Sequence, residues 1–236
     1  MNRSKTALSS FLIATCFWMV FSSAVIASKE AGTEQTLLQD VLPNVCSFTG
    51  QFKQTKNMQG VPVSLKSDGD FLYSCRLGLI WNTTVPFNET LLVSHRRSSF
   101  RIDENGRVSS LQGALRYSMS KIFMRLLKGD EDFFAREFAI QKTADNGITE
   151  LRPESDFMKK GIEVIRISKI EDEETGITLN IEILRADEQS STIDIFNLTE
   201  ATHVESRAQA FKYCETVYQS TTKWCKILRQ PAQFGR

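Results

Sequence analysis

The residue types that most often carry out chemistry in proteins are scarce in this chain of 236 residues. It has two histidines, His95 and His203, and neither lies at a metal-ligand spacing from other donors. The Cys-x-x-Cys, Gly-x-Ser-x-Gly, P-loop and dinucleotide-binding patterns do not occur. We therefore predict a protein that is not an enzyme, with no catalytic residue, no metal site and no cofactor.

Two groups of carboxylates and one histidine have simpler interpretations than acid–base catalysis. Residues 171–174 are all acidic, but they lie between two predicted strands, and Gly176 follows them, which is typical of a charged hairpin turn. The acidic residues 130–132 suit the positive end of a helix. His95 precedes two arginines in a predicted turn, where we expect a solvated side chain rather than a general base.

The first 27 residues predict export. Arg3 and Lys5 precede an apolar run that closes on Val25-Ile26-Ala27, a small-residue cleavage pattern. We expect a cleaved signal peptide over residues 1–27. An uncleaved membrane anchor is the alternative, because the apolar run is nearly long enough to span a bilayer.

The mature chain has an almost balanced charge. Without the leader it keeps 27 basic and 28 acidic residues, which gives a net charge of −1. This balance implies no patch for nucleic acid or for an anionic membrane. The mature length of about 209 residues suits a single domain of strands.

Four cysteines remain after the leader, and an even number in an exported protein indicates disulfides. Their spacing favours Cys46 with Cys75 and Cys214 with Cys225, because each pair flanks a segment with the pattern of a hairpin. On one continuous helix the second pair would lie about 16 Å apart, so we expect the chain to reverse near residues 219–222. Four buried free thiols are the alternative interpretation.

Alternation of apolar and polar residues dominates the mature chain and predicts a mainly β fold. Short turns join most of the predicted strands, so neighbouring strands must be antiparallel, and we expect a meander that curls into a half-open barrel. The predicted strands cover residues 46–53, 65–75, 78–84, 90–94, 98–103, 107–111, 138–143, 148–152, 162–170, 177–184 and 191–197.

A helical insertion separates the two halves of this meander. Apolar residues recur at helical spacing over residues 115–126, the pattern ends at Gly129, and a second helical segment follows over residues 131–138. A further short amphipathic helix is predicted over residues 37–42. The insertion is well placed to cover the concave side of the sheet. The periodicity fits both an apolar cavity and a closed core.

Several short motifs resemble the LolA-like family of periplasmic outer-membrane lipoprotein carriers. They follow in the family's order: Phe48-Thr-Gly-Gln-Phe-Lys-Gln-Thr-Lys, Ser67-Asp-Gly-Asp-Phe-Leu-Tyr, Gly78-Leu-Ile-Trp81 and Val85-Pro86. Later pieces resemble an exporter-associated branch of the family: Leu127-Lys-Gly-Asp, Leu151-Arg-Pro-Glu and Ser191-Thr-Ile-Asp-Ile-Phe-Asn197. The resemblance implies a carrier domain over residues 28–200, while residues 201–236 form a cysteine-containing extension without a counterpart in the pattern.

The resemblance implies a periplasmic, monomeric carrier that shields acyl chains of lipoproteins or lipids in an apolar cavity. Its partners would be an inner-membrane exporter and an outer-membrane acceptor. The cavity wall carried over by position comprises Phe52, Phe71, Trp81, Leu91, Val93, Phe100 and Ile102. The lid comprises Met119, Phe123 and Leu126. The alternative function on the same scaffold is a periplasmic lipoprotein-sensing or interaction domain of an envelope-regulation system.

Overall fold

The computed structural model describes residue 42 and residues 45–95, 98–113, 122–142, 147–172, 176–201 and 203–234. All of them belong to one compact unit, which spans residues 35–236. The predicted helix at residues 37–42 and most of the one at residues 115–126 lie outside the described residues. Leu42 is described, and its side chain is buried.

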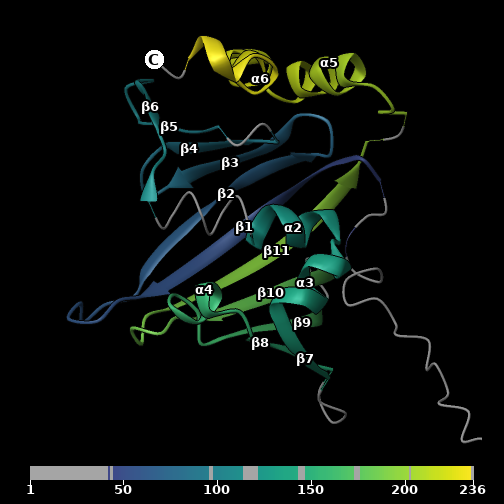
Figure 1. Cartoon of the computed structure of the whole chain (residues 1–236). Coiled ribbons are helices and arrows are strands. Elements are labelled where there is room, and N and C mark those ends of the chain that lie inside the picture. Colours follow the sequence, from purple (N-terminus) through teal and green to yellow (C-terminus); the bar gives the residue numbers. More distant parts are fainter. Residues whose placement is uncertain are drawn as a thin grey trace, which may run out of the picture. The chain divides into compact units, whose positions relative to one another are not determined.

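Eleven strands and several short helices make up the described part of this unit (Figure 1). The strands are β1 (Ser47–Asn57), β2 (Leu65–Ser74), β3 (Gly78–Val85), β4 (Glu89–Ser94), β5 (Ser99–Ile102), β6 (Val108–Ser110), β7 (Phe138–Lys142), β8 (Thr149–Pro153), β9 (Val164–Asp172), β10 (Gly176–Leu184) and β11 (Ser190–Glu200). The helices are α2 (Met124–Lys128), α3 (Glu131–Glu137), α4 (Asp156–Lys159), α5 (Arg207–Val217) and α6 (Lys223–Arg229), with short 3-10 turns η2 (Gln219–Thr221) and η3 (Pro231–Gln233).

The strands form one antiparallel sheet in the order β6-β5-β4-β3-β2-β1-β11-β10-β9-β8-β7. Each half is a meander of hairpin-connected strands, and the first and last strands join the halves, with Phe52 opposite Ile195. β6 and β7 remain at the two edges, so the sheet is open and forms a half-barrel. The predicted fold class is confirmed, and every predicted strand is present with its ends shifted by a few residues.

In the connection between the two halves, the described residues 122–137 are mainly helical, in agreement with the prediction for that part. α2 ends at Gly129, whose backbone adopts the left-handed conformation with φ 64°. Asp130 caps α3 by accepting a hydrogen bond from the backbone N–H of Phe133. The short helix α4 was not predicted, because its single turn carries too little periodicity. Ser155 caps it through the backbone N–H of Met158.

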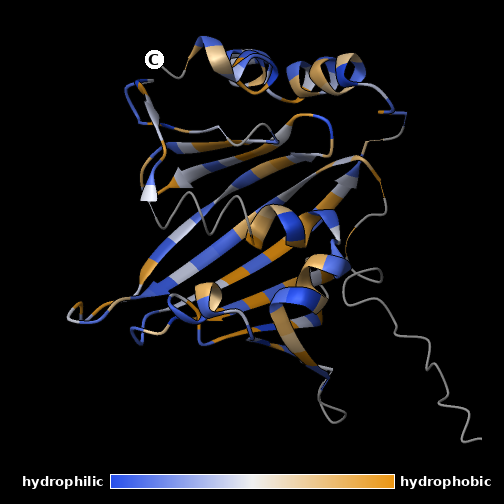
Figure 2. Cartoon of the chain, viewed as in Figure 1, coloured by the Kyte–Doolittle hydropathy of each residue, from blue (hydrophilic) through white to orange (hydrophobic). Residues whose placement is uncertain are grey.

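Successive side chains of a strand point to opposite faces of the sheet, so each strand contributes to two faces. Hydrophobic residues occur along the strands of both halves (Figure 2). We call the face that α2 and α3 cover the inner face. Its buried side chains form one cluster with those of the two helices. The opposite, outer face differs between the two halves of the sheet.

In the half formed by β2 to β6, the outer face is also apolar, and it packs against α5 and α6. These helices bury Ala210, Ile227 and Leu228 in a second cluster with sheet residues such as Leu72, and the other sheet members are Ile80, Leu92, Phe100 and Ile102. The Tyr218 hydroxyl donates a hydrogen bond of 2.8 Å to Oδ1 of Asp70 on β2. This half of the sheet is therefore covered on both faces.

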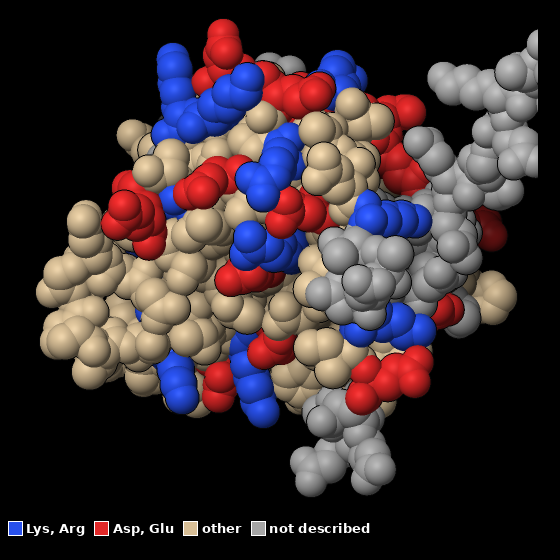
Figure 3. Space-filling view, turned by 90° about the horizontal axis from the view of Figure 1, so that it is seen from below, with Lys and Arg blue, Asp and Glu red and all other residues tan. Residues whose placement is uncertain are grey.

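In the half formed by β8 to β10, the outer face carries charges instead. Arg166 lies between Glu150 and Glu182 on neighbouring strands, with N···O distances of 3.1 and 3.0 Å. Seen from below, blue and red side chains are interspersed rather than gathered by sign (Figure 3). Exposed pairs of this kind add little stability, but they keep this part of the sheet hydrated.

Candidate functional site

An aromatic stack lines the inner face near the centre of the sheet. Phe52, Phe71 and Trp81 come from the adjacent strands β1, β2 and β3, and all three are buried. The Trp81 ring stacks on Phe52 with centroids 3.7 Å apart and on Phe71 with centroids 5.7 Å apart. These three residues and Leu91 and Val93 of β4 belong to the inner cluster, so five of the seven predicted wall residues lie together.

Two glycines make room for this stack. Gly69 lies opposite Phe52 in the register, and a Cβ on Gly69 would lie 2.8 Å from the tip of the Phe52 ring. Gly50 lies opposite Phe71 in the same way, and its Cβ would lie 2.6 Å from that ring. A larger residue at either position would therefore displace a ring, and at Gly69 it would first meet the backbone oxygen of Asn82 on β3. This explains why glycines recur in the motifs around residues 48–56 and 67–73.

The predicted lid contacts the wall directly. Phe123, immediately before α2, meets Trp81 edge-on with centroids 4.8 Å apart, and Leu126 of α2 is buried in the same cluster. Met119, the third predicted lid residue, lies outside the described residues. Within the described part of the chain, side chains of α2 and α3 cover the apolar wall, so an acyl chain could reach it only by displacing them.

The turn between α2 and α3 is held by Asp130. Its carboxylate pairs with Arg125 and Lys128 and caps α3. Burial favours the neutral form of this carboxyl group, but hydrogen bonds from Arg125 and from the backbone of Phe133 outweigh that effect and lower the pKa of Asp130. The lid is therefore fastened at its C-terminal end by a charged cap.

The structure corrects the placement of Phe100 and Ile102. We expected both in the inner wall, but they lie in the second cluster, on the outer face beneath α5 and α6. The register pairs Phe100 with Leu92, so the two residues share a face, while Arg101 lies opposite Leu91. The alternation along β5 was detected correctly. Its apolar side faces outward because the C-terminal helices cover that side.

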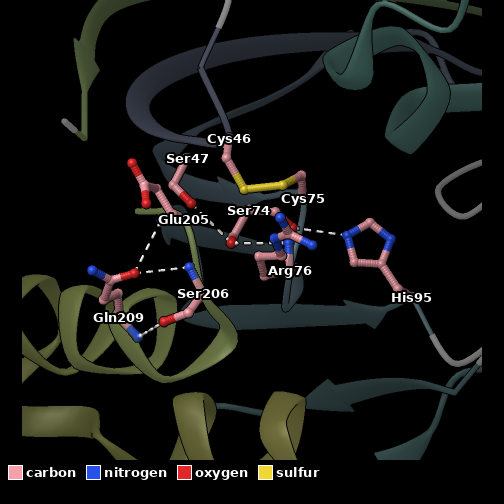
Figure 4. Close-up of a disulfide and its surroundings, with 9 residues drawn as sticks. All are labelled: Cys46, Ser47, Ser74, Cys75, Arg76, His95, Glu205, Ser206 and Gln209. Atoms are coloured by element: carbon pink, nitrogen blue, oxygen red, sulfur yellow. Dashed lines mark hydrogen bonds between the residues drawn. A yellow bond between two sulfur atoms is a disulfide. The ribbon is translucent and has the colours of Figure 1, made fainter. Parts of the chain in front are cut away.

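Both predicted disulfides are confirmed. Cys46 pairs with Cys75 across β1 and β2, at a Cα–Cα distance of 5.0 Å, and Cys214 pairs with Cys225 at 5.9 Å. The chain reverses between α5 and α6 at η2, where the sequence required it. Figure 4 shows the first disulfide beside the N-terminus of α5, where Ser206 and Gln209 form a capping box.

The remaining candidates for chemistry are spread over turns. His95 lies in the β4–β5 turn, and its Nε2 donates to the carbonyl oxygen of Ser74 at 2.8 Å (Figure 4), so it is not solvated on every side. His203 is exposed before α5. Glu171 is exposed and pairs with Lys169, as expected near a charged hairpin turn. Among the described residues, no group of three or more His, Cys, Asp or Glu side chains could hold a metal ion.

The sequence alone did not assign the second half of the inner face. Aliphatic residues of β8 to β11 complete the wall there, and α3 and the first residue of β7 add aromatic rings. Pairing of β1 with β11 places them beside the aromatic stack, and a strict alternation along residues 177–183 was the signal that could have found some of them. The residues are Leu151, Ile165, Ile167, Leu179, Ile181, Ile193 and Ile195, with Phe133, Phe134 and Phe138.

Comparison with known proteins decides the family. The family model "Outer membrane lipoprotein carrier protein LolA" matches residues 43–214, which cover the whole sheet, the lid and most of α5. The chain belongs to the LolA family. The LolA family is periplasmic, and its members are carrier proteins rather than enzymes, so membership indicates a role of the lipoprotein- or lipid-carrier type. The match continues past residue 200, where we expected the carrier domain to end.

Solved structures resemble this LolA-family chain only distantly. A DUF1329 family protein from Desulfovibrio piger has 9% identity and a TM-score of 0.41, covering 70% of this chain and 90% of that one. The ywiB protein from Bacillus subtilis has 10% identity and a TM-score of 0.21, with coverages of 66% and 93%. Among curated proteins, no match to the sequence is found. In the part of the chain that the structure describes, no helix is both long and apolar enough to cross a membrane.

Proposed function

We propose that this chain is an exported, monomeric periplasmic carrier that binds acyl chains of lipoproteins or lipids on its inner face. It takes them from an inner-membrane exporter toward an outer-membrane acceptor. The observation that carries the proposal is the contact between Phe123 and Trp81. A helical segment covers a broad apolar sheet face, and it contributes a ring that cargo can replace.

The free energy of burial is sufficient for such a carrier. Each methylene group moved from water into an apolar site gains about 0.8 kcal/mol. A chain of about sixteen carbons therefore gains on the order of 10 kcal/mol, from which the lost packing of the lid must be subtracted. This net free energy of binding sets how tightly cargo is held, and a partner protein that binds the lid or the cargo can change it.

The attachment of the covering helix supports its role as a lid. Gly129 ends α2, and the Asp130 cap of α3 follows directly. In the described part of the chain, α2 and the residue before it contact the sheet through side chains such as Phe123 and Leu126. Displacing it costs mainly the contacts of Phe123, Leu126 and their neighbours, while the sheet hydrogen bonds stay intact.

Native mass spectrometry of the protein, purified from its own cell envelope without detergent, tests binding. We expect bound lipid or acylated protein at one equivalent. Delipidated protein that also fails to bind a synthetic palmitoylated peptide would contradict the carrier function. The same preparation shows whether the chain is monomeric.

Transfer is tested separately from binding. Labelled acylated peptide is loaded onto the protein, which is then mixed with vesicles bearing an outer-membrane lipid extract. Movement of the label to the vesicles is the expected result. Stable binding with no transfer to any acceptor membrane or envelope extract would contradict transport and favour the lipoprotein-sensing function.

A further inference from the structure

One row of side chains across the inner face contains hydroxyl groups. The register pairs Phe48 with Tyr73, Tyr73 with Leu79, Leu79 with Val93, and Val93 with Ser99. Directly paired residues of adjacent strands point to the same side of a sheet. Because Leu79 and Val93 belong to the inner cluster, the whole row from Phe48 to Ser99 faces the lid side.

Two of these five side chains carry hydroxyl groups, and both hydroxyls are buried. Tyr73 is 1% exposed and Ser99 is 2% exposed. Within the described residues, neither hydroxyl has a hydrogen-bond partner. Buried polar groups in proteins are almost always paired, because leaving one unpaired is costly. The row therefore bears hydroxyls that the packing of the lid-covered protein does not use.

The surroundings of Tyr73 make its hydroxyl a permanent donor. Its ring lies 5.2 Å from that of Phe48, and the charged pair of Arg125 and Asp130 at the α2–α3 turn is close enough to act on it. Burial, and to a smaller extent the charge of Asp130, raises the pKa of Tyr73. The phenol thus stays protonated at every physiological pH.

We propose that the Tyr73 hydroxyl donates a hydrogen bond to an ester carbonyl of the acyl cargo. This inference rests on the proposed carrier function and specifies the chemical group that the inner face recognises. A carbonyl oxygen accepts hydrogen bonds and carries no net charge, so a single donor in apolar surroundings satisfies it. A phosphate in the same place would lose its hydration, and the nearby cation, Arg125, is already paired with Asp130.

Recognition of the ester fixes where the cargo lies. The ester is the point where the acyl chains join the glycerol unit, so anchoring it beside Tyr73 leaves the chains to run along the apolar wall. The next inward-facing row, two residues along each strand, contains Phe71 and Trp81. The Tyr73 row would thus bind the polar end of the acyl region, and the aromatic stack would bind the acyl chains.

The variant Tyr73→Phe tests this proposal, with Tyr218→Phe as its matched control. Each change removes one buried phenolic hydroxyl, but only the Tyr218 hydroxyl has a partner, Asp70. We expect Tyr73→Phe to keep or raise the unfolding midpoint, whereas Tyr218→Phe lowers it. The two variants should exchange roles in lipid binding. Lipid affinity should fall about three- to tenfold in Tyr73→Phe and stay constant in Tyr218→Phe.

The probes are a dipalmitoyl phospholipid, its ether-linked counterpart without the carbonyl groups, and a dipalmitoylglyceryl-cysteine peptide. Wild-type protein should bind the ester phospholipid more tightly than the ether, and Tyr73→Phe should abolish that preference. If Tyr73→Phe binds both the peptide and the phospholipid more weakly than the wild type does, the protein recognises the ester of either source. If only one of the two affinities falls, that source is the ligand.

Three results would overturn the role of Tyr73. They are an unchanged ester affinity in Tyr73→Phe, an equal loss for ester and ether, or a stability loss as large as that of Tyr218→Phe. If wild-type protein binds none of the probes, the carrier function itself fails. Binding of all probes without any effect of the substitution leaves the carrier function standing and removes only this inference.

Discussion

The rings of Phe123 and Trp81 meet in a T-shaped contact, at a centroid distance of 4.8 Å and an interplanar angle of 86°. This contact joins a covering helix to the centre of the sheet. Aromatic pairs in this geometry contribute about 0.5–1.5 kcal/mol beyond the area that they bury. A contribution of this size is small enough for an acyl chain to replace, as the proposed lid role requires.

Shortening Phe123 should therefore accelerate exchange of cargo. In Phe123→Ala, less packing is given up when the lid opens, so we expect both uptake and release of a fluorescent fatty acid to become faster. Stopped-flow mixing measures both rates, and Trp81 emission reports the opening. Phe100→Ala is the matched control, because Phe100 is equally buried on the outer face. It should lower the free energy of unfolding by about 3–5 kcal/mol and leave the exchange rates unchanged. Equal rates in wild type and Phe123→Ala would mean that the helix is permanent core.

Asp130 should make the lid sensitive to acid. Its pKa is lowered in the folded protein, so its stabilisation is complete above about pH 4 and is lost as the pH falls through the lowered value. Asp130→Asn keeps an oxygen for the helix cap but loses the charge, and we expect a loss of about 0.5–1 kcal/mol at pH 7. Denaturant unfolding at pH 7 and at pH 3 measures this difference, which should shrink in acid.

Asp130→Ala separates the cap from the ion pair. Removal of the capping oxygen should cost about 1 kcal/mol more than Asp130→Asn, and this extra loss should persist at low pH, where Asn still caps and Ala does not. If both variants unfold like the wild type at pH 7, the turn between α2 and α3 does not depend on Asp130.

The hydrogen bond from Tyr218 to Asp70 should hold the C-terminal helices on the sheet. Burial and the nearby charge of Asp70 raise the pKa of Tyr218, so its hydroxyl remains a donor. We expect Tyr218→Phe to lower the free energy of unfolding by about 1–2 kcal/mol. Tyr213→Phe, in the helix α5 that Tyr218 follows, is the control, since the Tyr213 hydroxyl makes no hydrogen bond within the described residues. Losses of the same size in both variants would contradict a specific role of the bond.

The Cys214–Cys225 disulfide should stabilise the same helical pair. Both sulfur-bearing side chains are fully buried in the outer cluster, and the bond closes a separation of 11 residues. From the chain entropy of a loop this short, replacing both cysteines by Ala should cost about 3 kcal/mol. Thermal unfolding of oxidised wild type and the double variant measures it. Lipid binding by the folded fraction should not change, because the bond lies on the outer side of the sheet.

The sequence by itself determined the strands and the helical segments on either side of Gly129, and it favoured both disulfide pairings and the reversal at η2. These features are set by local patterns: alternation along a strand, helical spacing up to Gly129, and the distance that two cysteines can span. The motifs also indicated the family, although the purpose of Gly50 and Gly69 became clear only when Phe71 and Phe52 were seen to lie across them.

Only the tertiary structure decided which side of each strand faces the lid. Phe100 and Ile102 alternate with Arg101 just as an inner-facing strand would, and nothing local distinguishes one face from the other. The choice depends on α5 and α6, more than a hundred residues later, which make the outer face of that half apolar as well. Pairing of β1 with β11 is likewise a long-range contact. It brings Ile195 beside Phe52 and joins the two meanders into one wall, beneath the lid that Phe123 fastens to Trp81.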